Sequence, residues 1–232
     1  MNIILRKHWN SLRSAADSGD ANAQWELGYC YETGVMDKSG RLLAAANPEV
    51  AIQWYQASAS QGSRQAQNSL GVILSSGGEV PKDLPRAIYW SKLAIAQGDS
   101  TAAFNLATIY RDMGKPKLAF RCYQKSGAMG DNDAHLQIGL CHFFGFGTLQ
   151  DFASARSSFE RVIACDPSTC CQRSIENARY WLSVLQLIRG PTTKGKLARV
   201  RSLLETANAD DDHEQANELL NLIGKTRYQT AA

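Results

Sequence analysis

The sequence lacks the long apolar runs and charge asymmetry that mark membrane or nucleic-acid-binding proteins. No stretch approaches the roughly 18 apolar residues that a transmembrane helix needs, so we expect no membrane insertion. The net charge of +3 is small and spread along the chain, which argues against a nucleic-acid partner. A short apolar run before Arg6, Lys7 and His8 has the wrong charge order for a signal peptide, so we expect a cytoplasmic protein.

Few residue combinations suggest catalysis or metal binding. The sequence has no Gly-x-x-x-x-Gly-Lys phosphate loop, and no Ser or Cys has a convincing base beside it. The four histidines (His8, His135, His142 and His213) are far apart, although His135 and His142 share one expected helix. Two turns apart and without a carboxylate partner, they indicate a packed or groove-facing pair rather than a metal site. We therefore expect no enzyme activity, metal or cofactor, and keep an enzyme only as an outside alternative.

The six cysteines form no recognisable ligand set. Cys30, Cys122 and Cys141 lie among apolar residues of expected helices, which favours buried reduced thiols over disulfides or ligands. A second group (Cys165, Cys170 and Cys171) clusters in a loop. No Cys-x-x-Cys motif or His pair completes a zinc site there, and a redox role for this cluster stays open.

The chain does contain a repeated sequence motif. Gly19, Gly62, Gly98 and Gly130 each close one helical segment and open the next, at spacings of 43, 36 and 32 residues. A period in this range indicates an array of helical hairpins. Such arrays are mostly surface, and they usually hold another molecule.

The first helix of each repeat carries Ala, then Leu or Ile four residues later, then a small residue. The copies are Ala23/Leu27/Gly28, Ala66/Leu70/Gly71, Ala102/Leu106/Ala107, Ala134/Ile138/Gly139 and, more weakly, Ala178/Leu182/Ser183. Glycine inside a helix costs about 1 kcal/mol relative to alanine. Its recurrence predicts a partner helix that crosses too closely for a side chain.

The second helices share a stripe with offsets 0, +3, +4, +8 and +11, as in Ala51, Trp54, Tyr55, Ala59 and Gly62. This is one face of a 3.6-residue helix. Asn47, Asp83 and Asp151 precede three of these helices, where their side chains can cap the first turn. Extra residues between Gly34 and Asn47 account for the longest spacing.

Together these patterns predict an all-α fold, a right-handed α-solenoid of about four to five helix-turn-helix repeats with terminal capping helices. We expect a single domain over 1–232, with an N-terminal capping helix at 1–18 and four repeats at 19–165. A degenerate repeat and C-terminal cap follow at 173–225. Helices are expected near 173–189, 196–208 and 213–225, and Gly190-Pro191 separates the first two.

These repeated motifs resemble those of the Sel-one-like repeat family, which is related to the tetratricopeptide repeats. Leu27-Gly28-x-x-Tyr31, Gly145-x-Gly147-x-x-x-Asp151 and Ala51-x-x-Trp54-Tyr55 carry the resemblance, which covers roughly 19–165. It implies an adaptor, an immunity or inhibitor protein, or a scaffold in secretion or signalling.

If the first helices line a concave face, as in tetratricopeptide arrays, residues two before and two and five after the Leu or Ile point into a groove. This predicts the following partner-binding residues: Trp25, Tyr29, Asn68, Phe104, Thr108, Arg111, Leu136, Phe143 and Tyr180. The alternative is that some of them are core residues. Aromatic side chains with an Arg are typical of protein interfaces.

The sequence therefore favours a non-enzymatic module, monomeric, that binds another protein in its groove. Two finer hypotheses stay open. One is an immunity protein that neutralises a cognate toxin, favoured because the chain is small and shows no second domain or signal peptide. The other is a scaffold or assembly adaptor for a secretion, envelope or signalling complex.

Overall fold

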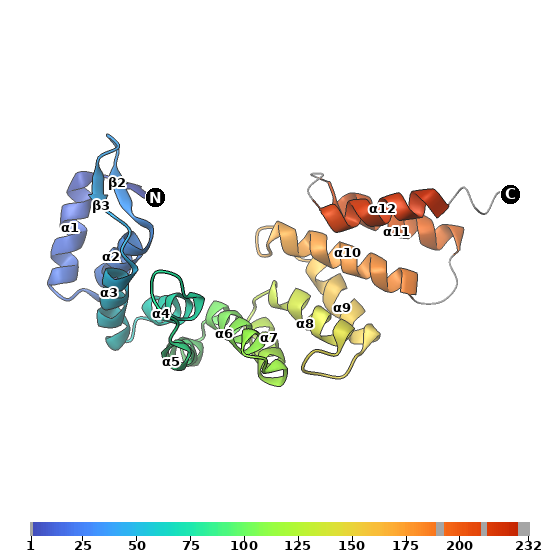
Figure 1. Cartoon of the computed structure of the whole chain (residues 1–232), viewed down its shortest axis with the longest axis horizontal. Coiled ribbons are helices and arrows are strands. Elements are labelled where there is room, and N and C mark those ends of the chain that lie inside the picture. Colours follow the sequence, from blue (N-terminus) through green and yellow to red (C-terminus); the bar gives the residue numbers. More distant parts are fainter. Residues whose placement is uncertain (1, 189–192, 210–212, 227–232) are drawn as a thin grey trace. The chain divides into compact units, whose positions relative to one another are not determined.

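The computed structural model describes residues 2–188, 193–209 and 213–226, which form twelve α-helices and three short strands. The chain divides into two compact units, Met1–Gly114 and Lys115–Ala232. Within each unit, successive helices pack side by side as helix-turn-helix pairs (Figure 1). The predicted all-α repeat fold is confirmed.

Unit 1 contains six helices. They are α1 (Arg6–Asp17), α2 (Ala21–Thr33), α3 (Pro48–Ser60), α4 (Arg64–Ser76), α5 (Leu84–Ala96) and α6 (Ser100–Asp112). The amphipathic helix α1 packs against α2, where Trp9 and Leu12 are buried with Leu27. It lies where the N-terminal capping helix is expected.

A small sheet in unit 1 has no counterpart in the sequence prediction. Strand β1 (Asn2–Ile4) pairs parallel with β2 (Val35–Asp37), which pairs antiparallel with β3 (Leu42–Ala44). In the turn between β2 and β3, Asp37 Oδ1 accepts hydrogen bonds from the backbone N–H groups of Ser39 (2.9 Å) and Arg41 (3.0 Å). The extra residues between Gly34 and Asn47 are thus largely a β-hairpin.

The repeated glycine marks where one helix ends and the next is capped. Gly19, Gly62 and Gly98 have φ values of 98°, 92° and 87°, a region that other residues rarely adopt. The residue after each glycine caps the following helix; for example, Asp20 Oδ1 accepts a hydrogen bond from Ala23 N at 2.8 Å. The predicted caps of the second helices, Asn47, Asp83 and Asp151, are confirmed.

The small residue of the first helices lies where a second helix crosses closely, as predicted. A Cβ added to Gly28 would lie 2.6 Å from Tyr55 Cδ1, and one added to Gly139 would lie 2.5 Å from Phe159 Cε1. A Cβ on Gly71 would collide with Ser91 Oγ. These contacts leave no room for a larger residue without rearrangement.

Unit 2 also contains six helices in the part that the structure describes. They are α7 (Pro116–Ala128), α8 (Ala134–Phe144), α9 (Phe152–Ile163), α10 (Gln172–Ile188), α11 (Lys194–Ala207) and α12 (Glu214–Thr226). The last three match the helices expected after residue 172. The expected break at Gly190-Pro191 lies outside the described residues.

Candidate functional site

The first helices of three repeats lie in a row in unit 1. Trp25 Nε1 on α2 donates a hydrogen bond to Ser69 Oγ on α4 at 3.2 Å. Asn105 Nδ2 on α6 donates to Asn68 Oδ1 on α4 at 3.1 Å. We call the outward side of these helices the A-face; it comprises Trp25, Tyr29, Asn68, Val72, Phe104, Thr108 and Arg111.

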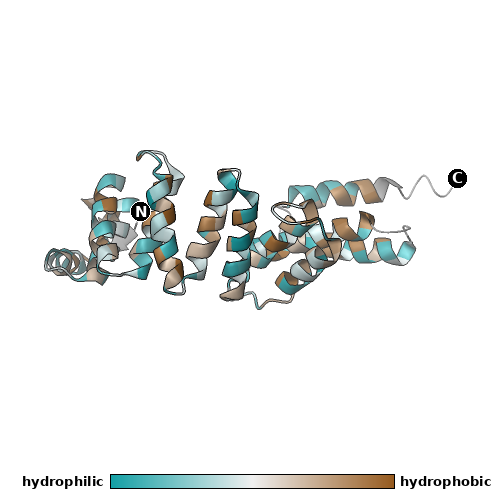
Figure 2. Cartoon of the chain, turned by 90° about the horizontal axis from the view of Figure 1, so that it is seen from below, coloured by the Kyte–Doolittle hydropathy of each residue, from teal (hydrophilic) through white to brown (hydrophobic). Residues whose placement is uncertain are grey.

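All seven A-face residues retain contact with solvent. Tyr29 is 47% exposed and Val72 is 39% exposed, which is high for large apolar side chains on a packed helix. Trp25 and Phe104 are half-buried, as are Asn68 and Thr108. In unit 1, hydrophobic and hydrophilic residues are interspersed along the helices (Figure 2).

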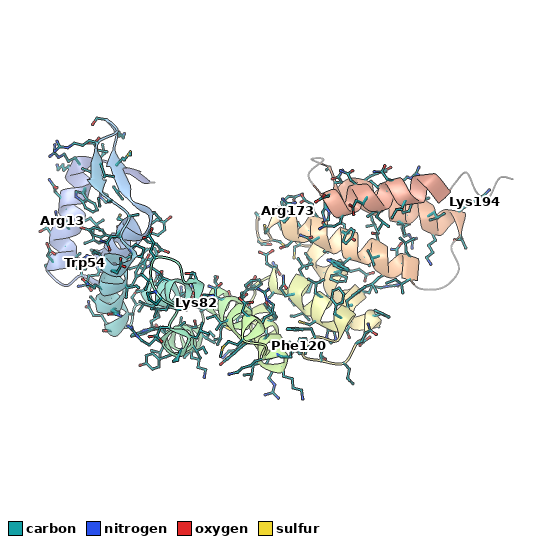
Figure 3. All side chains as sticks on the ribbon, viewed as in Figure 1. Arg13, Trp54, Lys82, Phe120, Arg173 and Lys194 are labelled. Carbon is teal, nitrogen blue, oxygen red and sulfur yellow. The ribbon has the colours of Figure 1, made fainter. Side chains whose placement is uncertain are left out.

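A cleft of about 380 Å³ opens beside the A-face, between α4, α6 and the start of α5. Val72 and Thr108 of the A-face line it, together with apolar Leu84 and Ile109. Lys82, labelled in Figure 3, lies at the same cleft. The cleft could accept an apolar side chain from a bound partner.

The charged groups of the A-face are few. The Arg111 guanidinium lies at its edge and pairs with Asp112, with Nε 3.1 Å from Oδ1. Both side chains are about half exposed, so this pair contributes little to stability. Arg111 therefore remains accessible to a partner.

A hydrogen bond joins α2 of the A-face to the neighbouring helix α3. Tyr55 on α3 is fully buried, and its hydroxyl donates to Glu32 Oε2 on α2 at 2.6 Å. Burial, followed by the neighbouring Glu32 carboxylate, raises the pKa of Tyr55 far above its usual range. This hydrogen bond ties α2 of the A-face to α3.

Sequence reasoning missed a ladder of glutamines that links successive repeats. Gln61 Nε2 donates to Gln24 Oε1 at 2.8 Å, and Gln97 Nε2 donates to Gln67 Oε1 at 2.8 Å. Gln24 and Gln67 are buried, and each also donates to a carbonyl of the preceding helix. The sequence does contain a pattern that could have revealed these glutamines, because each buried Gln directly follows the recurrent Ala.

In unit 2 the structure corrects the predicted binding residues. Leu136 and Phe143 are 6% and 7% exposed and belong to the core formed by α8, α9 and α10. The Phe143 ring centroid lies 5.1 Å from that of Trp181 on α10. Because α10 packs against these helices, Leu136 and Phe143 are not available to a partner.

Tyr180 is also partly covered. It packs against the apolar cluster of α11 and α12, and its ring centroid lies 5.3 Å from that of His213. Burial and then the charge of Glu218 raise the pKa of its hydroxyl. Six of the nine predicted residues therefore lie on the A-face, and the other three do not.

The described residues show no arrangement for metal-dependent chemistry. No group of three or more His, Cys, Asp or Glu side chains among them could hold a metal ion. His135 is half-buried, and burial lowers its pKa. No helix in the described part of the chain is long and apolar enough to cross a membrane.

The cysteines are free thiols in differing environments. Burial raises the pKa of Cys30 and of Cys141 to about 11. Cys170 is 6% exposed and its thiol donates to Asp133 Oδ1 at 3.4 Å. Burial and this carboxylate raise the pKa of Cys170 to about 12, which disfavours the reactive thiolate.

Comparison with known families identifies the repeats. The Sel1 repeat model matches residues 21–63, 64–99, 100–131 and 132–157. The chain therefore belongs to the Sel1 repeat family, as the resemblance indicated. This fold, shared with tetratricopeptide-like proteins, is typical of non-enzymatic protein–protein interaction. The limits at 1–18, 19–165 and 173–225 remain predictions.

Individual relatives agree with this assignment. An uncharacterized protein of Neisseria meningitidis is 32% identical over 146 residues, which are 62% of this chain and 28% of that protein. DAP3-binding cell death enhancer 1 of Rattus norvegicus is 29% identical, over 56% of this chain and 35% of that protein. The chain thus spans about a third of the length of these curated relatives.

Two solved structures are similar in fold. The first is c5321, a protective antigen of uropathogenic Escherichia coli with a Sel1-like repeat fold. It has a TM-score of 0.74 and 26% identity, over 93% of this chain and 44% of that one. A Sel1 repeat protein of Oxalobacter formigenes has a TM-score of 0.67 and 23% identity, over 88% of this chain and 79% of that one.

Proposed function

We propose that this chain is a non-enzymatic module that binds a partner protein on the A-face of unit 1. One observation carries the proposal: Tyr29 and Val72 are exposed near half-buried Trp25 and Phe104, on three helices that hydrogen bonds link to one another. Aromatic residues surrounded by polar ones are typical of interface centres. A preformed surface also loses little conformational freedom on binding.

The magnitude of the effect follows from how interfaces distribute binding energy. A few central residues, most often Trp, Tyr and Arg, each cost 2 kcal/mol or more of binding when truncated to Ala. Tyr29 is the best candidate because its side chain is exposed and its hydroxyl forms no hydrogen bond with any residue that the structure describes, so truncation removes mainly contact surface. Trp25 is a riskier choice, because its truncation also removes the hydrogen bond to Ser69.

Site-specific photo-crosslinking tests the proposal. Benzoylphenylalanine is placed at Tyr29 of the full chain in its native host, and crosslinked proteins are identified by mass spectrometry. A matched control carries the same group at Tyr89 on α5, an exposed tyrosine away from the A-face. We expect a crosslinked partner from position 29 and not from position 89. Equal crosslinking from both positions, or none from position 29, contradicts the proposal.

Two finer roles remain hypotheses within this function. An immunity protein predicts one partner bound very tightly, and protection when it is co-expressed with a toxin from a neighbouring gene. A scaffold for a secretion, envelope or signalling complex predicts several partners of modest affinity. The number of crosslinked partners and their dissociation constants therefore separate the two roles.

The compartment and the oligomeric state are part of the same proposal. We infer a cytoplasmic, monomeric protein. Its six free thiols support a reducing compartment, because exposed thiols such as Cys171 tend to be oxidised outside the cell. Sedimentation equilibrium tests the monomer, and turnover of a substrate that persists after loss of the A-face side chains would favour an enzyme instead.

A further inference from the structure

The connection between α9 and α10 in unit 2 contains three cysteines that the proposed function does not use. They are Cys165, Cys170 and Cys171. Cys170 is buried, Cys165 is partly buried and Cys171 is exposed. Cys170 is a member of the apolar cluster of α8, α9 and α10, and Cys165 packs against the same cluster. Two of the three thiols therefore share one environment.

A tight turn separates Cys165 from Cys170. Thr169 N donates a hydrogen bond to Asp166 O at 2.8 Å, which closes a four-residue turn. Ser168 N also donates to Asp166 Oδ1 at 2.8 Å, which fixes the turn from within. Cys165 directly precedes this turn and Cys170 directly follows it. Because such a turn folds the chain back on itself, the two cysteines approach each other.

The two thiols influence each other directly. Burial, then the Asp133 carboxylate, and finally the Cys165 thiol raise the pKa of Cys170 to about 12. The Cys165 thiol acts both as a neighbouring charge and as a hydrogen-bonding group. Effects of this kind act over roughly 4–6 Å, so the two sulfur atoms are neighbours. Both residues are free cysteines in this structure.

Contacts with the start of α8 hold this connection in place. Asp133 Oδ1 accepts hydrogen bonds from Cys170 Sγ at 3.4 Å and from Cys171 N at 3.0 Å. Asn132 Nδ2 donates to Thr169 Oγ1 at 3.2 Å. The position of the Cys170 thiol is thus set by a neighbouring helix as well as by the turn.

From these observations we propose that Cys165 and Cys170 form a reversible intramolecular disulfide, which makes the α9–α10 connection a redox-sensitive site. A disulfide needs Cα atoms about 4.4–6.8 Å apart, a separation that residues on either side of a tight turn can reach. Disulfides inside cells are usually transient and redox-sensing. A pair that is reduced in this structure and placed to close agrees with that behaviour.

The oxidant we propose is a small disulfide such as glutathione disulfide, which reacts in two exchange steps. The Cys165 thiolate attacks one of its sulfur atoms, forms a mixed disulfide and releases one glutathione, which takes up the proton that Cys165 lost. The Cys170 sulfur then attacks the Cys165 sulfur and releases the second glutathione. The proton of Cys170 passes to that glutathione through the Asp133 carboxylate, to which the thiol already donates. Two protein thiols are oxidised, and one glutathione disulfide is reduced to two glutathione molecules.

Differential alkylation of the full chain tests the proposal. The protein is equilibrated in glutathione buffers of increasing oxidised fraction, and its free thiols are blocked with iodoacetamide. Thiols released by later reduction are labelled with N-ethylmaleimide. Trypsin cleaves after Arg161 and Arg173, and fragmentation of the resulting peptide assigns a label to each of its three cysteines. The intact mass before reduction distinguishes an internal disulfide from a glutathione adduct.

We expect the folded wild type to lose two free thiols, those of Cys165 and Cys170, without retaining glutathione. The control variant Cys171→Ser should oxidise like the wild type, whereas Cys165→Ser and Cys170→Ser should form no internal disulfide. Serine is similar in size and can also donate a hydrogen bond, and circular dichroism checks that each variant is folded. Half-oxidation should need a lower ratio of oxidised to reduced glutathione in the folded protein than in urea.

Three results would overturn the proposal. The first is that the folded protein forms glutathione adducts alone or stays reduced. The second is that the disulfide contains Cys171, or is lost in Cys171→Ser. The third is that the pair oxidises as readily in urea as in the folded protein. None of them bears on the A-face, because Tyr29 and its neighbours lie in unit 1.

Discussion

Two alanine substitutions at equivalent repeat positions test how the helices of a repeat pack, because we expect them to change stability in opposite directions. Gly28→Ala and Gly71→Ala change the same repeat position in the same compact unit. At Gly28 the new Cβ would lie 2.6 and 2.7 Å from two carbon atoms of the Tyr55 ring. At Gly71 it would meet the hydroxyl of Ser91, a small group that can rotate away.

The magnitudes follow from two opposing terms. Alanine is favoured over glycine in a helix interior by about 1 kcal/mol. Overpacking a rigid core costs about 1–3 kcal/mol. Tyr55 has no exposed surface and its hydroxyl is held by Glu32, so it cannot move aside. We therefore expect Gly28→Ala to lower the free energy of unfolding by up to about 2 kcal/mol, and Gly71→Ala to raise it by up to about 1 kcal/mol.

Urea denaturation followed by circular dichroism measures both variants against the wild type. A second pair of variants tests whether the Tyr55 ring causes the destabilisation. Both carry Tyr55→Ser, which places at position 55 the residue found at the equivalent position 91, and only one of them also carries Gly28→Ala. In that background Gly28→Ala should no longer destabilise. The reasoning is refuted if Gly28→Ala is as stable as Gly71→Ala, or if its cost persists after Tyr55→Ser.

Three further predictions concern hydrogen bonds and thiols. Tyr55→Phe removes the bond to Glu32 and should cost about 2 kcal/mol of folding free energy. Because the pKa of Tyr55 is raised in the folded protein, wild-type stability should be complete below pH 10.0 and fall above it, and Tyr55→Phe should lack this fall in pH-dependent denaturation. Asp99→Ala removes the cap of α6 and should cost about 1 kcal/mol, measured by urea denaturation. In timed alkylation read by mass spectrometry, exposed Cys171 should react before buried Cys30; equal rates would contradict the burial.

Periodicity explains why the repeats could be predicted. Each repeat is a local unit, so the same sequence spacings recur along the chain. They place Tyr55 against Gly28 in one repeat and Phe159 against Gly139 in another. The helix caps were equally local, because Asp83 and Asp151 bond N–H groups within three residues. Signals that repeat at short range are therefore readable without a structure.

The features that could not be predicted from the sequence depend on contacts between segments far apart in the chain. Strand β1 pairs with β2 across about thirty residues, as Asn2 faces Val35, and neither strand is long enough to show alternation. Leu136 and Phe143 occupy the right repeat positions for a groove, yet α10 covers them. Repeat offsets identify a helix face, but they do not show which later helix packs on it.

The central claim is that a partner protein binds on the A-face. Its most direct test is the affinity of the crosslinked partner for three purified proteins: the wild type, Tyr29→Ala and the matched surface control Tyr89→Ala, by biolayer interferometry. Our account predicts that Tyr29→Ala weakens binding at least 30-fold, equivalent to about 2 kcal/mol, while Tyr89→Ala binds like the wild type. Unchanged affinity in Tyr29→Ala, or an equal loss in both variants, would contradict it.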